Sequence, residues 1–180
     1  MRALVVYESM YGNTRAVASN IADGLRSDYE VTVVPVAEAT WDLVADADLL
    51  VAGAPTHMHG MSTRSTRRMA AQGAAKDGGD LRLDPDADGP GMRDWLRDLG
   101  HRSGLAAAFD TRLSGVPAFT GRAGRPIARL LRRRDRRLIA APESFLVSSQ
   151  STLLDGEADR ARRWGMTIGA ACKTHLPAHA

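Results

Sequence analysis

The sequence predicts a doubly wound α/β fold, in which a parallel sheet is covered by helices on both faces. Three observations support this prediction. Short apolar runs typical of fully buried strands recur along the chain, amphipathic helical patterns lie between them, and turn-forming residues follow the runs. Parallel neighbours in a sheet need a crossover connection, so this alternation favours a parallel sheet. We expect five strands in a three-layer α/β/α arrangement.

The first two strands are expected close to the amino terminus. Residues 3–7 read ALVVY, a buried-strand run, and apolar residues at four-residue spacing then predict a helix over about residues 13–25. A second strand is expected over residues 31–36. Its Pro35 suits a strand end or a sheet edge, because proline cannot donate a ladder hydrogen bond. A short helix through Trp41 follows.

Three further strands complete the predicted sheet. They are expected over residues 47–55, 104–109 and 137–149, and Pro142 bends the last of them. A final helix is predicted from Asp155, because small and apolar residues share one side of it.

Residues 70–91 do not fit this alternation. They are too rich in glycine and aspartate for a core element, so we expect a long surface excursion before a helix around MRDWLRDL. The stretch DPDADG within it lacks the glutamate that closes a calcium loop. The sequence therefore predicts no metal site in this segment.

Composition limits the classes of function. A chain of 180 residues is expected to form a single domain, residues 1–180. No apolar stretch approaches the roughly 20 residues that span a bilayer, and the amino terminus carries no secretion signal, so we expect a cytoplasmic protein without a membrane span. Cys172 is the only cysteine. It cannot form an internal disulfide, so any redox chemistry needs a bound cofactor.

Charge is distributed unevenly along the chain, which has a net charge of +3. Residues 1–60 carry 3 Lys or Arg against 8 Asp or Glu, whereas residues 61–137 carry 17 against 9. Residues 126–137, PIARLLRRRDRR, predict an amphipathic helix with arginines on one face. We favour a solvated face for these arginines, with docking of an acidic redox partner as the alternative. No nucleic-acid-binding motif is evident, so no nucleic-acid partner is expected.

The loop at residues 8–14, ESMYGNT, follows the first predicted strand. Open α/β sheets bind ligands at the carboxyl ends of their strands, and a helix amino terminus favours an anion. The loop lacks the lysine of a nucleoside-triphosphate loop and the three glycines of a dinucleotide fingerprint. Neutral hydroxyl and amide donors remain, and these suit a phosphate monoester.

Residues 9–14, SMYGNT, resemble the phosphate-binding loop of the flavodoxin family, whose ligand is flavin mononucleotide (FMN). Tyr11 stands where the family usually has Ser or Thr, although related quinone reductases also have Met-Tyr-Gly there. Two further segments, 53–62 and 108–115, resemble the loops that hold the flavin ring. All three follow predicted strands in the family's order, and the resemblance covers most of the chain outside 70–91.

The resemblance implies that these three segments bind FMN. It assigns to the cofactor site Ser9, Met10, Tyr11, Gly12, Asn13 and Thr14 from the first segment, Pro55, Thr56, His57, Met58, His59 and Gly60 from the second, and Phe109, Asp110, Thr111, Arg112 and Gly115 from the third. No metal site is expected, because the loop histidines His57 and His59 lack a third ligand of suitable spacing.

Individual roles follow from the same resemblance. The family usually stacks a tyrosine or tryptophan on the flavin ring, and residues 57–59, His-Met-His, stand there instead. Losing that aromatic lowers affinity roughly tenfold. The Gly60 peptide is expected near N5 of the ring, and residues 110–112 near its pyrimidine edge. Arg112 would stabilise negative charge on the reduced ring there.

The resemblance implies an electron-transfer protein that serves a redox partner protein or a small-molecule acceptor. Two alternatives stay open: an FMN-dependent NAD(P)H:quinone or small-molecule oxidoreductase, and a flavin-free interaction scaffold with the same fold. The sequence assigns no catalytic residue. It leaves open the donor and acceptor, a deazaflavin in place of FMN, and the oligomeric state.

Overall fold

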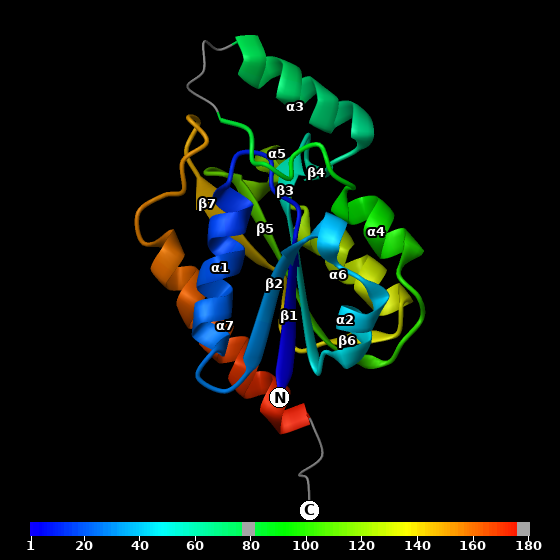
Figure 1. Ribbon diagram of the computed structural model, residues 1–180. Coiled ribbons are helices and arrows are strands. Elements are labelled where there is room, and N and C mark those ends of the chain that lie inside the picture. The colour runs from blue at the N-terminus through cyan, green and yellow to red at the C-terminus, as the bar shows by residue number, and fades with distance from the viewer. Residues whose placement is uncertain (77–81, 176–180) are drawn as a thin grey trace, which may run out of the picture.

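The computed structural model describes residues 1–76 and 82–175. Within them a twisted sheet lies between two layers of helices (Figure 1). The strands are β1 (Arg2–Tyr7), β2 (Glu30–Pro35), β3 (Leu49–His57), β4 (Gly60–Met61), β5 (Gly104–Leu113), β6 (Arg136–Leu138) and β7 (Glu143–Val147). The helices are α1 (Asn13–Leu25), η1 (Val36–Glu38), α2 (Trp41–Asp46), α3 (Arg64–Lys76), α4 (Met92–Asp98), α5 (Pro117–Thr120), α6 (Gly124–Arg133) and α7 (Glu157–His175).

The strand order confirms the predicted fold class. Strands run β2-β1-β3-β5, and both β6 and β7 pair with β5, all in parallel. Helices α1 and α7 bury one face of this sheet, and α2, α4 and α6 bury the other (Figure 1). Because both faces are covered, the strands contain continuous apolar runs rather than alternating ones. None of the helices in the described ranges is long and apolar enough to span a membrane.

The carboxyl-terminal part of the sheet corrects two predictions. The strand expected over residues 137–149 is two strands, β6 beside the start of β5 and β7 beside its end. Pro142 lies in the break, where its missing N–H removes no ladder bond. The arginine-rich helix expected over residues 126–137 ends at Arg133, and Arg136 is a buried residue of β6.

The central strands are longer than predicted. Strand β3 continues to His57 and turns into the antiparallel hairpin partner β4, and β5 continues to Leu113. Segments expected to be loops are therefore strand ends, which gives them fixed positions.

Helix α3 was not predicted. Its amino terminus carries a reciprocal cap, in which the Thr66 amide donates to Thr63 Oγ1 and the Thr63 amide donates to Thr66 Oγ1. Of the expected excursion at 70–91, residues 70–76 belong to α3, residues 77–81 lie outside the described ranges, and Asp84 and Ala87 are buried. The segment after residue 82 thus packs against the body of the protein.

We predict that Gly165→Ala destabilises the fold by about 1–3 kcal/mol, because the new methyl group overpacks the contact between α7 and α1. A Cβ on Gly165 would collide with the carbonyl oxygen of Ile21. Urea unfolding measures the effect. Gly73→Ala is the matched control: it lies in α3 with no atom within 4 Å of the added Cβ, and it should raise stability by up to about 1 kcal/mol. Equal effects of the two substitutions would contradict this account.

Candidate functional site

A cavity of about 280 Å³ opens at the carboxyl edge of the sheet, where β1, β3, β5 and β7 end. All three segments singled out by the sequence contribute to it. Its lining residues are Met10, Tyr11, Asn13, Pro55, Thr56, His57, Ala70, Thr111, Arg112, Leu113, Val147, Ser149 and Ser151. The topology therefore brings eight of the predicted residues around one space.

The first segment forms a turn that leaves the amino terminus of α1 open. Gly12 has φ 84°, the left-handed region that suits glycine, and its amide donates to Ser9 Oγ at 3.2 Å. No side chain within the described ranges caps α1, and its first turn has no acidic residue. Backbone amides at this helix end can thus take an anion.

The polar side chains of Tyr11, Asn13 and Thr14 form hydrogen bonds with other parts of the protein. The Tyr11 hydroxyl donates to Ala70 O at 3.1 Å, and Asn13 Nδ2 donates to Ser151 O at 2.6 Å. The hydroxyls of Thr14 and Thr111 share a buried hydrogen bond of 2.7 Å. These contacts fix the loop, so any phosphate bound there depends chiefly on main-chain donors.

The second segment is a hairpin. His57 pairs with Gly60, and the two residues between them, Met58 and His59, have φ of 44° and 73°. Of these residues only His57 lines the cavity. Met58 is 77% exposed at the hairpin tip. His59 forms a backbone bridge with Gly121 and lines a separate cleft.

The third segment divides between cavity and core. Thr111 and Arg112 line the cavity. Phe109 is fully buried and makes edge-to-face contacts with Phe145 and Trp164, and the Asp110 carboxylate points to α6. These two side chains therefore stabilise the scaffold beneath the cavity.

Gly115 has φ 127° in the loop after β5, outside the cavity lining. Its carbonyl accepts from Arg112 Nη1 at 3.0 Å, as do Leu113 O and Thr120 Oγ1. Gly115 thus helps to hold the Arg112 guanidinium in place.

Five lining residues were missed by the sequence analysis: Ala70, Leu113, Val147, Ser149 and Ser151. Ser149 and Ser151 follow β7 at the same sheet edge as the other loops, so their position after a strand was a usable signal. Ala70 carried no signal, because α3 was not predicted.

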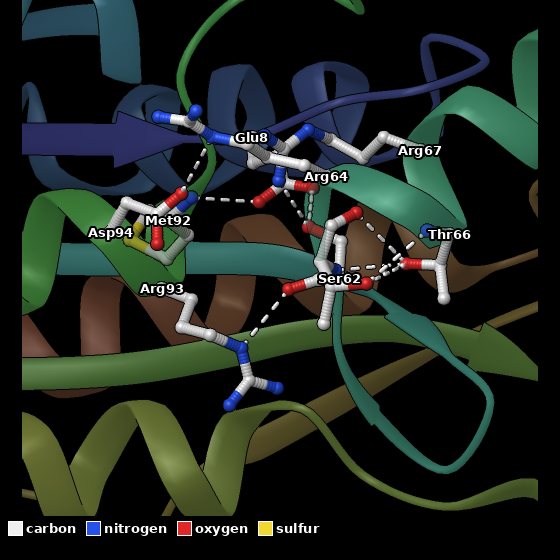
Figure 2. Close-up of polar contacts among 9 residues, drawn as sticks. Glu8, Ser62, Arg64, Thr66, Arg67, Met92, Arg93 and Asp94 are labelled. Carbon is white, nitrogen blue, oxygen red and sulfur yellow. Dashed lines mark hydrogen bonds and ion pairs between the residues drawn. The ribbon is translucent and has the colours of Figure 1, made fainter.

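A buried polar network supports the hairpin and the first loop together (Figure 2). Glu8, 5% exposed at the end of β1, accepts hydrogen bonds from the Ser62 hydroxyl through Oε1 and from the Met92 amide at 2.8 Å through Oε2. Arg67 Nη1 donates to Ser62 Oγ at 3.1 Å, and Arg93 donates to the carbonyl of Ser62. One carboxylate thereby connects β1, the residue after the hairpin, and the start of α4.

The sequence model of the flavodoxin family matches residues 5–108. This is more than half of the chain, and it includes two of the three cavity segments. The chain belongs to the flavodoxin family. No curated protein sequence matches it.

Solved flavodoxins share the whole fold of this family member. An archaeal flavodoxin is 21% identical with a TM-score of 0.64, and the match covers 96% of this chain and 99% of the other. Flavodoxin 1 from Bacillus cereus is 20% identical with a TM-score of 0.62, over 98% and 99%. A flavodoxin, WrbA-like protein from Agrobacterium tumefaciens is 18% identical with a TM-score of 0.60, over 97% and 99%. At these identities the likeness concerns the fold.

Two buried polar atoms on the cavity lining lack a partner within the described ranges of this flavodoxin-family chain. They are His57 Nε2 and Arg112 Nε. A buried polar atom without a partner is costly unless a ligand or water satisfies it. Burial, together with Arg67, outweighs Glu8 and lowers the pKa of His57. Across neutral pH the His57 ring is therefore uncharged. These atoms, with the open amides of α1, fit a ligand that has hydrogen-bonding groups and an anionic end.

No three His, Cys, Asp or Glu side chains in the described part of this chain could together hold a metal ion.

We predict that Glu8→Ala lowers the free energy of unfolding by about 2–4 kcal/mol, because the Met92 amide and the Ser62 hydroxyl lose their buried acceptor. Glu8→Gln keeps an oxygen acceptor and should cost less. Urea denaturation measures both variants, with Glu38→Ala, an exposed glutamate, as control. The network has no such role if Glu8→Ala costs no more than the control.

We predict that Asp110 makes stability fall as pH rises from about 4 to 6. Burial raises its pKa from 3.8 to about 6, although the Gly124 amide donates to it at 2.6 Å. Between these values the folded protein binds more protons than the unfolded chain. The stabilisation is therefore complete below pH 4 and lost above pH 6, a change of about 3 kcal/mol.

Denaturant unfolding of wild type and Asp110→Asn at pH 4.5 and 7.5 measures this effect. The variant should lose that part of the pH slope, whereas Asp155→Asn, at an exposed position, should keep it. An unchanged slope in Asp110→Asn would show that Asp110 does not titrate in this range.

Proposed function

We propose that this protein binds FMN non-covalently in the cavity and transfers electrons between redox partners. The observation that carries the proposal is the convergence of three segments on one cavity, with the open amino terminus of α1 at its side. Membership of the flavodoxin family supports the same assignment. The phosphate would meet the open main-chain amides at the start of α1, and the ring would lie between the β3 and β5 ends.

The chain's own residues would bind and orient the cofactor. Bound FMN supplies one- and two-electron chemistry at its ring. Arg112, held by three acceptors through Nη1, keeps Nε available for an acceptor atom at the ring edge. Its positive charge favours negative charge on that edge. His57 would contact the ring as a neutral imidazole from the β3 end.

Exposed apolar side chains surround this end of the molecule and suit a protein partner. Met58 at the hairpin tip, Leu113 after β5, and Val116 and Phe119 around α5 are each 50% exposed or more. Helix α3 lies at this end of the molecule (Figure 1). Arg122 and Arg125 line a cleft together with His59 of the hairpin, so an acidic partner surface would complement their charge. We infer that electron transfer occurs to such a partner at this end.

A cleft beside the hairpin favours the enzymatic alternative. It has a volume of about 480 Å³ and is lined by His59, Arg122 and Arg125. No ion pair to either arginine exists among the described residues. An FMN-dependent oxidoreductase with an anionic substrate would use such a cleft next to its flavin. The carrier remains our proposal, because the cleft and the cavity share no lining residue.

We predict that the protein binds added FMN with a red-shifted visible spectrum and quenched fluorescence, and that Gly12→Asp weakens this binding at least roughly tenfold through like-charge repulsion of the phosphate. Gly156→Asp is the matched control. It places the same charge at a positive φ of 78°, and no atom lies within 4 Å of its added Cβ. Equal affinity in wild type and Gly12→Asp would place the phosphate elsewhere, and no binding by wild type would favour the flavin-free scaffold.

Reduction assays on the same FMN-loaded protein distinguish an electron carrier from an enzyme. Fast reduction by a flavoprotein reductase, with no direct oxidation of NADH or NADPH in the presence of a quinone, is the result expected for a carrier. Rapid quinone-dependent NAD(P)H oxidation would favour the oxidoreductase instead.

A further inference from the structure

A buried carboxylate lies beside the loop to which we assign the phosphate. The side chain of Asp84 is 0% exposed, and its Oδ2 would lie 3.8 Å from a Cβ placed on Gly12. The Asp84 amide donates to Met10 O at 2.8 Å. The segment that follows residue 82 is thus anchored directly on the loop, with a negative charge facing its glycine.

Among the described residues, Arg15 is the one cation paired with this carboxylate. Arg15, in the first turn of α1, places Nε 3.2 Å from Asp84 Oδ2, without the alignment of a hydrogen bond. Its Nη2 would lie 3.9 Å from a Cβ on Gly12, so both charges flank the same residue. Arg15 is half exposed, whereas Asp84 is fully buried. Solvent therefore screens the arginine more than the carboxylate, and the pair leaves a net negative influence on the loop.

The same two residues also act on a neighbouring tyrosine, in opposite directions. The pKa of Tyr7 is raised to about 12, first by burial and then by Asp86 and Asp84, while Arg15 opposes them. The Tyr7 hydroxyl lies 3.5 Å from Asp86 Oδ2. Asp84 also has a structural role, since its Oδ1 accepts from the Asp86 amide at 3.4 Å and its carbonyl accepts from the Ala87 amide. That role needs oxygen acceptors but no charge.

We propose that Asp84 and Arg15 set the affinity of the first loop for a phosphate monoester, Asp84 lowering it and Arg15 offsetting that loss. The inference rests on the proposed FMN site and names two residues that set its affinity for the phosphate. The first turn of α1 attracts anions. In this chain a carboxylate of the protein already lies within that field, so an incoming phosphate meets repulsion that a neutral neighbour would not give.

Comparing FMN with riboflavin isolates the effect on the phosphate, because riboflavin lacks it. Fluorescence quenching should show FMN binding to Asp84→Asn roughly tenfold tighter than to wild type, and to Arg15→Gln roughly tenfold more weakly. Riboflavin affinity should stay within about twofold for each variant. Asparagine keeps an oxygen for the Asp86 amide, so the turn is preserved. Asp88→Asn, an exposed acid of the same segment, is the control and should leave both affinities unchanged.

The outcomes separate this proposal from the proposed function. An unchanged or weaker FMN affinity in Asp84→Asn, with a native thermal transition, would overturn the proposal and leave the FMN site intact. If no variant binds either flavin, the FMN assignment fails, and inorganic phosphate observed by ³¹P NMR becomes the probe. Tighter phosphate binding by Asp84→Asn than by wild type would then support the proposal. Equal or absent binding in both would overturn it.

Discussion

The buried carboxylate of Glu8 joins the segments at the carboxyl edge of the sheet by accepting hydrogen bonds from them. At the carboxyl edge of the sheet β3 and β5 stay paired as far as Pro55 and Thr111, whereas β1 ends at Tyr7 and the loop after it lies outside the ladder. Glu8 compensates by accepting from both Ser62 and Met92. A buried carboxylate is destabilising unless its oxygens accept hydrogen bonds. The folded state therefore favours the positions in which Ser62 and Met92 donate to Glu8. Glu8 therefore joins the first loop to the segment that follows the hairpin.

The sequence predicts those parts of the fold whose physical cause is local. Strands covered on both faces must be apolar throughout, and α1 shows its buried stripe by spacing, so β1 and α1 were found within one residue. The first loop was found for the same reason. Gly12, at φ 84°, occupies a position where the backbone favours glycine, and such a glycine after a strand can be recognised in a single sequence.

Features that depend on tertiary partners were not predicted. The hairpin tip has Met58 and His59 in left-handed conformations, where Asn-Gly would have been the recognisable signal. It exists because β4 pairs with β3 and His59 with Gly121. Tyr11 and Asn13 were assigned to the cofactor site, and both line the cavity, but the sequence did not indicate their hydrogen-bond partners in α3 and in the segment after β7. Side-chain direction is decided by neighbours far along the chain, which no local pattern records.

Both ends of the proposed flavin site have features that would lower its affinity for FMN. At the ring, a neutral His57 stands where a larger aromatic would bury more surface, and such differences are worth about 1 kcal/mol. At the phosphate, neutral main-chain donors lie beside the Asp84 carboxylate, whose negative charge the half-exposed Arg15 offsets in part. Free energies at separate ends of a ligand add when the ends share no partner. The combined effect is a larger dissociation constant than either end alone would give, so occupancy would follow the supply of cofactor rather than remain complete.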